Sequence, residues 1–182
     1  PALSELQRLS LVVEERRRPT PEYRFCHGLV QEAAYGRLPD SARHELHRRV
    51  GEALESLHTQ SLDEVSGLLA WHFSEADDAP RAIDYLLRAG DASRAVYADA
   101  EAVDFYRRAL AFMNRCGDRD RARETLLRVA LTHQLAFDFP HAGEAYEEAF
   151  AEPVPVKPRL EPTERVIVTM LAPDAVVPGH TY

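Results

Sequence analysis

A small-residue signature that recurs in the second half of the chain constrains its fold more than any other feature. The signature is an alanine, three residues, a bulky apolar residue, two residues and a second alanine. It occurs as Ala82–Leu86–Ala89, Ala102–Tyr106–Ala109 and Ala142–Tyr146–Ala149. On a helix these three positions lie along one stripe, where two small residues let a neighbouring helix approach closely and the larger side chain fills the gap. The signature therefore predicts helices packed side by side.

The stretch 40–151 has a helical pattern almost throughout, and turn-forming residues divide it. Pro80 stands in a first helical turn, where its missing N–H costs nothing, and Gly117 separates two helices. Ser61 and Glu64 form a capping-box pair before VSGLLAWHF. The predicted N-caps are Asp40, Asp99 and Asp118. We predict seven helices between 27 and 151, joined by turns so short that neighbours run antiparallel.

Residues 3–35 have the order helix, hairpin, helix. LSLVV (9–13) is rich in strand-forming residues, EERRRPTPE (14–22) is a charged turn with two prolines, and YRF (23–25) returns as a second short strand. A helix then begins near His27. This order fits the tail of a winged-helix domain, in which a hairpin follows a helix.

Residues 152–182 differ from the rest because they hold half of the twelve prolines. EPVPVKPRLEP (152–162) predicts an extended linker, since each proline fixes its own φ and disfavours helix in its predecessor. RVIVTML (165–171) predicts a strand without a partner nearby in the sequence. An unpaired apolar strand invites edge pairing. We therefore expect it to join the 9–13 and 23–25 hairpin or a second copy of the chain.

The alanine signature resembles the second helix of tetratricopeptide repeats, and the resemblance covers about 62–151. It departs from that family in its register. The distance from Ala82 to Ala102 is 20 residues and that from Ala102 to Ala142 is 40, where the family has about 34. The alternative is a generic helical bundle with alanine-rich seams.

A second resemblance lies in YRFCHGLVQEAAYGRLPDSARHELHRRVGEALE (23–55), most specifically from Tyr23 to Tyr35. The stretch resembles the junction between winged helix and helical-repeat sensor in bacterial signal-transduction ATPases of the STAND type. WHFSEADDAPRAIDYLLRAG, from Trp71, is similar to the first repeats of such proteins. The resemblance implies a regulator whose ATPase module lies upstream. The chain also begins in a helical pattern without Met, so we expect it to be part of a longer polypeptide.

The same resemblance singles out His27 as a nucleotide contact in the intact protein. In the resembling ATPases the histidine after the winged-helix strand reaches the phosphates of ADP and helps to hold the inactive state. Gly28 follows here, where many relatives carry Asp, so any capping by that carboxylate is lost. The alternative is that His27 only caps the helix or packs against the hairpin. No glycine-rich phosphate loop occurs, since the eight glycines are isolated, and we expect no cofactor in this chain.

Other candidate sites have simpler explanations. His44 and His47 flank Glu45 and Leu46, but a metallohydrolase helix needs its second histidine at 48, where Arg stands. We expect no metal there and assign the pair to a solvated basic face. Arg16, Arg17 and Arg18 form a charge run that we expect to be solvated, with contact to DNA phosphates as the alternative. The helix around Trp71 is apolar nearly all round, which predicts core or the inner wall of the array.

Composition and charge exclude several classes of function and indicate the compartment. The net charge of −8 argues against a nucleic-acid partner, and no apolar run approaches the ~20 residues of a membrane helix. The N-terminus lacks the basic start and apolar core of a secretion signal. We expect a cytoplasmic protein with Cys26 and Cys116 as reduced, buried thiols, a disulfide being the alternative. Ser, His, Asp and Cys show no arrangement of nucleophile and base, so we expect no enzyme.

Together these patterns predict an all-α chain in three regions. Residues 1–38 are a winged-helix remnant, 39–151 are tetratricopeptide-like repeats, and 152–182 are a proline-rich linker and strand or the start of another domain. The expected function is a module of a bacterial regulatory ATPase or transcriptional regulator that binds a protein, peptide or ligand in a groove whose residues the sequence does not identify. The alternative is a structural adaptor joining a regulator to a solute-binding-like sensor, because residues 164–182 resemble the opening strand of bacterial peptide-binding lipoprotein domains.

Overall fold

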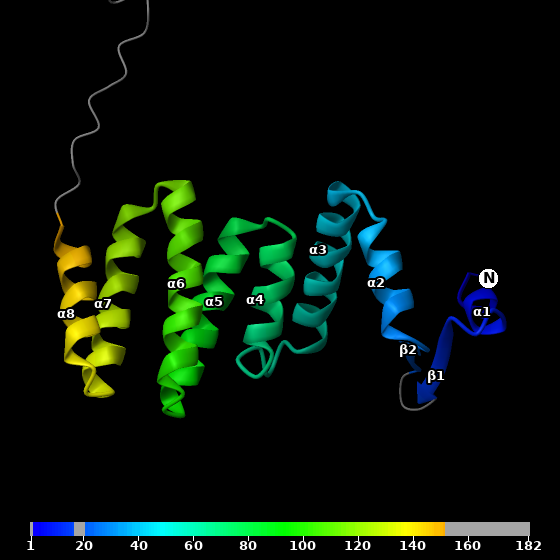
Figure 1. Ribbon diagram of the computed structural model, residues 1–182, viewed down its shortest axis with the longest axis horizontal. Helices are drawn as coiled ribbons and strands as arrows, with labels where there is room; N and C mark the ends of the chain where they lie inside the picture. The colour runs from blue at the N-terminus through cyan, green and yellow to red at the C-terminus, as the bar shows by residue number, and fades with distance from the viewer. Residues whose placement is uncertain (1, 17–20, 152–182) are drawn as a thin grey trace, which may run out of the picture. The chain divides into compact units, whose positions relative to one another are not determined.

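The computed structural model of the chain describes residues 2–16 and 21–151, which form eight helices and one two-stranded sheet. The N-terminal elements are α1 (Ala2–Arg8), β1 (Val12–Arg16), β2 (Glu22–Phe25) and α2 (Gly28–Gly36). The longer helices are α3 (Asp40–Leu57), α4 (Ser66–Glu75), α5 (Ala79–Ala95), α6 (Asp99–Cys116), α7 (Arg119–Leu135) and α8 (Phe139–Phe150). Each helix from α3 to α7 packs against the next one in the chain (Figure 1). The mostly helical class and the seven helices between 27 and 151 are confirmed.

The hairpin begins later than the sequence suggested, because the turn that ends α1 occupies the first residues of the predicted 9–13 strand. The amide of Leu11 donates to the carbonyl of Leu6 and closes the helix, while Ser10 adopts a φ of 55°. β1 and β2 then pair antiparallel. The hairpin is thus confirmed, whereas its membership of a winged helix stays a prediction. The strand predicted at 165–171 lies outside the described residues.

Four turns of one kind join the helices from α4 to α8. A residue with positive φ stands in each of them, at Asp77, Tyr97, Gly117 and Phe137. The following amide donates to the carbonyl five residues earlier, in the pairs Asp78–Phe73, Ala98–Ser93, Asp118–Met113 and Asp138–His133. This is the hydrogen bond of the Schellman helix end. The turns recur at residues 77, 97, 117 and 137, so 20 residues are the regular length of one helix and its turn.

The core follows the alanine stripes. All six alanines of the three signatures are buried, and Tyr106 at the centre of one stripe is fully buried. Two glycines let aromatic rings lie directly on a neighbouring helix. A Cβ added at Gly90 would stand 2.5 Å from the Tyr106 ring, and one added at Gly51 would stand 2.8 Å from the Phe73 ring. Close packing through small residues is therefore confirmed on α5, α6 and α8.

The helix starts show which predicted caps form. Asp118 caps α7 as predicted, its carboxylate accepting the amide of Arg121 at 3.3 Å. Asp78 caps α5 in the same way. Asp40 and Asp99 are not caps: each is the first residue of its helix, in the first turn, where a negative charge still favours the helix dipole.

One prediction for the segment before α4 is wrong, and the prediction for α4 itself holds for only part of the helix. The capping box of Ser61 and Glu64 does not form, because Leu62 and Val65 pack against the core and hold 62–65 as a turn, so that the helix begins only at Ser66. The helix around Trp71 is core only in part: Leu69 and Phe73 are buried, whereas Leu68 and Trp71 are each 45% exposed, and their place on an inner wall of the array stays a prediction. The buried side of α4 consists of Ser66, Leu69, Ala70 and Phe73.

The compact unit that contains these elements ends at Phe150. The boundary predicted between residues 38 and 39 falls inside this unit and stays a prediction. Among the described residues, none of the helices combines the length and the apolar character that crossing a membrane requires.

Candidate binding face

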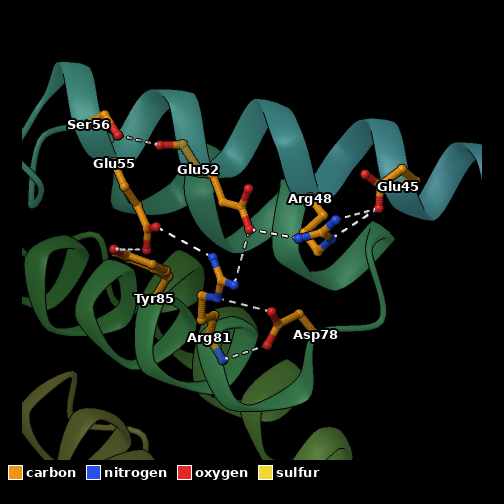
Figure 2. A network of polar contacts seen from close by, with 8 residues as sticks. All are labelled: Glu45, Arg48, Glu52, Glu55, Ser56, Asp78, Arg81 and Tyr85. Carbon is orange, nitrogen blue, oxygen red and sulfur yellow. Dashed lines mark hydrogen bonds and ion pairs between the residues drawn. The ribbon is translucent and has the colours of Figure 1, made fainter.

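Ion pairs connect α3 to α5 through one central guanidinium (Figure 2). Arg81 of α5 lies 3.3 Å from Glu52 and 3.5 Å from Glu55, both on α3. Its Nε is 3.0 Å from the cap residue Asp78, and its guanidinium lies 4.7 Å from the centre of the Phe73 ring. With partners on several sides, Arg81 is held in one position.

The same kind of contact continues from α5 to α7. Arg121 donates to Asp84 at 2.6 Å, and Arg128 donates to Asp91 at 3.1 Å. The two arginines stand seven residues apart on α7, as the two aspartates do on α5, which places each pair along one helix stripe. We call the surface that carries these pairs the α3/α5/α7 face.

A hollow of about 390 Å³ opens on the α3/α5/α7 face. α5 provides most of its lining, while α3 and α7 each contribute one charged residue, Glu55 and Arg128. The polar residues that α5 contributes are Arg81, Asp84, Tyr85, Arg88 and Asp91. Three arginines and three carboxylates therefore surround the hollow.

Two tyrosines hold carboxylates of this lining in place. Tyr85 donates its hydroxyl to Glu55 at 2.7 Å, and the buried Tyr106 donates to Asp91 at 2.6 Å. Burial, and then the hydrogen bond to Glu55, raise the pKa of Tyr85 to about 12. Burial and the bond to Asp91 likewise raise the pKa of Tyr106. Both phenols stay protonated near neutral pH, so they act as hydrogen-bond donors and not as bases.

Arg88 is the least constrained arginine of the hollow. Among the described residues its one ion pair is with Asp63, at 3.5 Å, and the side chains of the pair are 50% and 81% exposed. Its guanidinium also lies 5.9 Å from the centre of the Tyr85 ring. Exposed ion pairs of this kind contribute only about 0–1 kcal/mol. Arg88 can therefore exchange its partner for a ligand at little cost.

A second polar cluster joins α2, α3 and α4, and it corrects the prediction of a solvated face around His47. That residue is only 6% exposed. Its Nε2 lies 2.9 Å from the hydroxyl of Tyr35, and its Nδ1 lies 3.1 Å from Nδ1 of His72. The contact between the two nitrogens has room for one proton, so the two rings cannot both carry a proton there. His44, in contrast, is exposed, as predicted.

Burial is the main cause that lowers the pKa of both histidines. For His47, Glu75 opposes this shift, while Arg43 and His44 add to it. For His72, the neighbouring His47 lowers the pKa further. The surroundings of the two rings therefore favour the neutral form of both histidines.

The remaining predicted residues lie apart from these clusters. His27 is the N-cap of α2, is exposed, and its side chain makes no capping hydrogen bond within the described residues. Arg16 pairs with Glu22 at 3.3 Å, while Arg17 and Arg18 lie outside the described residues. Both cysteines are free thiols, but neither is fully buried as predicted: Cys26 is half-buried and Cys116 is exposed.

Sequence analysis missed the α3/α5/α7 face, although a signal was present. Asp78-x-x-Arg81 and Asp118-x-x-Arg121 repeat the same short pattern 40 residues apart, and Arg88 and Arg128 have the same separation. A search for repeated charged positions, in addition to repeated alanines, would have found these residues.

No protein-family model, no curated protein and no solved structure matches the chain. Its function must therefore be argued from the fold and the surfaces described above.

Proposed function

We propose that the chain is a non-catalytic, tetratricopeptide-like module that binds a segment of a protein partner on the α3/α5/α7 face. The observation that carries this proposal is the hollow of about 390 Å³, which three helices line with charged groups, most of them held by contacts between helices. Recognition sites need polar groups held in place, because ordering loose side chains costs free energy on binding. Arg81, Tyr85 and Arg128 meet that requirement through their contacts with neighbouring helices.

The charges of the hollow favour a peptide over a nucleic acid. Its three arginines are matched by three carboxylates, whereas a nucleic-acid site needs a basic surface. A peptide carries donors, acceptors and charges of both signs at short intervals and so complements such a lining. Arg88 is the residue best placed to receive a carboxylate from the partner, because guanidinium and carboxylate pair in a planar, two-bond geometry.

The experiment is a selection of random peptides displayed on phage against the full chain, followed by affinity measurements on the selected peptides. Arg88→Ala should weaken their binding roughly tenfold or more, which corresponds to about 1.4 kcal/mol. Arg108→Ala is the matched control. Arg108 is 41% exposed, pairs with Asp104, and lies over the ring of Phe105 three residues before it, as Arg88 lies over Tyr85. Selection of no peptide, or equal losses in both variants, would refute the proposal.

We further propose that the module belongs to a bacterial regulatory ATPase or transcriptional regulator and works in the cytoplasm. This rests on the resemblance of Tyr23–Tyr35, with His27 as the nucleotide contact in the intact protein. Binding at the α3/α5/α7 face would then be transmitted through α2 to an upstream nucleotide switch. The encoding gene should specify a P-loop upstream of Pro1, and His27→Ala in the intact protein should weaken ADP retention. An upstream sequence without a P-loop removes this part of the proposal and leaves the binding module.

A further inference from the structure

Three side chains with metal-ligand chemistry converge at the turn between α7 and α8. His133 stands in the last turn of α7, Asp138 lies between the helices, and His141 is in the first turn of α8. Nδ1 of His133 is 3.1 Å from Oδ2 of Asp138, and Nδ1 of His141 is 2.7 Å from the same oxygen. One ligand atom from each residue lies within 4.8 Å of the other two.

The equivalent turns of the array show that a helix cap alone does not need these histidines. Asp78 and Asp118 occupy the place of Asp138 in their turns. Each caps its helix by accepting the backbone amide of the arginine three residues later. Five residues before those aspartates stand the buried apolar residues Phe73 and Met113. Of these three turns, only the one between α7 and α8 has a histidine both five residues before and three residues after its aspartate. A helix cap, in which the backbone of His141 donates to the carboxylate, explains the aspartate but not the two imidazoles beside it.

The arrangement suits a small divalent ion. Ligands at about 2.0–2.1 Å from a tetrahedral ion lie about 3.3 Å from one another. The two nitrogens now lie 3.1 Å and 2.7 Å from Oδ2 of Asp138, so they need to move outward by only about 0.2–0.6 Å to admit an ion. The side chain of His133 is 20% exposed, that of Asp138 is 35% exposed and that of His141 is 62% exposed, so one side of the group is open to solvent. An ion can enter from that side and keep water in its remaining positions.

We propose that His133, Asp138 and His141 bind one divalent transition-metal ion of the Zn²⁺ class. Two imidazole nitrogens and one carboxylate oxygen suit Zn²⁺, whereas Mg²⁺ and Ca²⁺ prefer sites made of oxygen alone. Each imidazole binds through Nδ1 and carries its proton on Nε2. The ion links the end of α7 to the start of α8 and fixes the turn that presents the exposed rings of Phe137 and Phe139.

The test is calorimetric titration of the untagged full chain with ZnCl₂ and, separately, with MgCl₂. We expect one Zn²⁺ to bind at this site and no heat from Mg²⁺. His141→Ala removes an exposed ligand without disturbing the core and should weaken Zn²⁺ binding at least about 100-fold, since even residues that only support a ligand contribute 10–100-fold. Asp138→Asn should weaken it similarly, although asparagine caps a helix as well as aspartate does.

His44→Ala is the control, because His44 is exposed on α3 and far along the chain from the turn. It should leave Zn²⁺ binding unchanged. The apo forms of the wild type and Asp138→Asn should have similar melting temperatures in EDTA, which separates the ligand role of Asp138 from its capping role. Absence of Zn²⁺ binding by the wild type overturns the proposal. Wild-type affinity in either His141→Ala or Asp138→Asn also overturns it, because the ion would then be bound elsewhere.

Discussion

Replacing Gly90 with alanine tests the packing of the array at its tightest contact. The added Cβ would stand 2.5 Å from Cε1 of Tyr106, a distance at which something must move. That ring is fully buried and its hydroxyl is bound to Asp91 at 2.6 Å, so it cannot retreat without losing contacts. Overpacking of this kind costs roughly 1–3 kcal/mol, while alanine gains about 1 kcal/mol over glycine inside a helix. The net change should be a destabilisation of about 0–2 kcal/mol.

Gly143→Ala is the control that isolates the steric term. Gly143 is exposed on α8, and a Cβ added there meets nothing within 4 Å. This variant should be stabilised by up to about 1 kcal/mol, because it gains the helix preference of alanine without a clash. Urea denaturation followed by circular dichroism gives the free energy of unfolding of both variants. Their difference should be about 1–3 kcal/mol, and two equal stabilisations would refute the argument that Tyr106 is fixed against α5.

Three further predictions concern stability. Ala109→Leu should lower the free energy of unfolding in urea by roughly 1–3 kcal/mol, because Ala109 is fully buried in its stripe. An unchanged free energy of unfolding would contradict the close approach of a neighbouring helix at Ala109. Tyr85→Phe should cost about 1.5 kcal/mol in the same assay, since it leaves Glu55 without its phenol donor. The third concerns pH. His47 and His72 have pKa values lowered from 6.5, so the folded state binds fewer protons than the unfolded state below that pH. Their contribution to stability is complete above pH 6.5 and declines as the pH falls through the lowered values. His72→Gln should therefore lose less stability than the wild type between pH 7.5 and 5.5, and identical losses would refute the paired-ring account.

The helical part of the fold could be predicted from the sequence because its signals are local. The alanine stripes, Pro80 and Gly117 each act within one helix or one turn. The turns at Tyr97 and Phe137 could not be predicted in this way. Bulky residues rarely adopt positive φ, and here the packing of two successive helices imposes that conformation. The same applies to the late start of β1, which depends on how α1 ends.

The surfaces were harder to predict because their contacts join helices far apart in the sequence. Arg81 looks like an ordinary exposed helix residue until α3 places Glu52 and Glu55 beside it. His47 lies between charged neighbours in the sequence and was assigned to solvent, yet Tyr35 and His72 enclose it from two other helices. Short-range patterns determine which helices form, whereas the pairing of their faces determines which polar residues become a site.

The most direct test of the proposed binding face is a map of where a selected peptide contacts the full chain. Backbone amide chemical shifts recorded by NMR during a peptide titration provide that map residue by residue. We predict that the largest changes fall on α5 around Asp84, Arg88 and Asp91, with smaller changes near Glu55 of α3 and Arg128 of α7. Changes concentrated on α6 and α8, or confined to the hairpin of β1 and β2, would contradict the account.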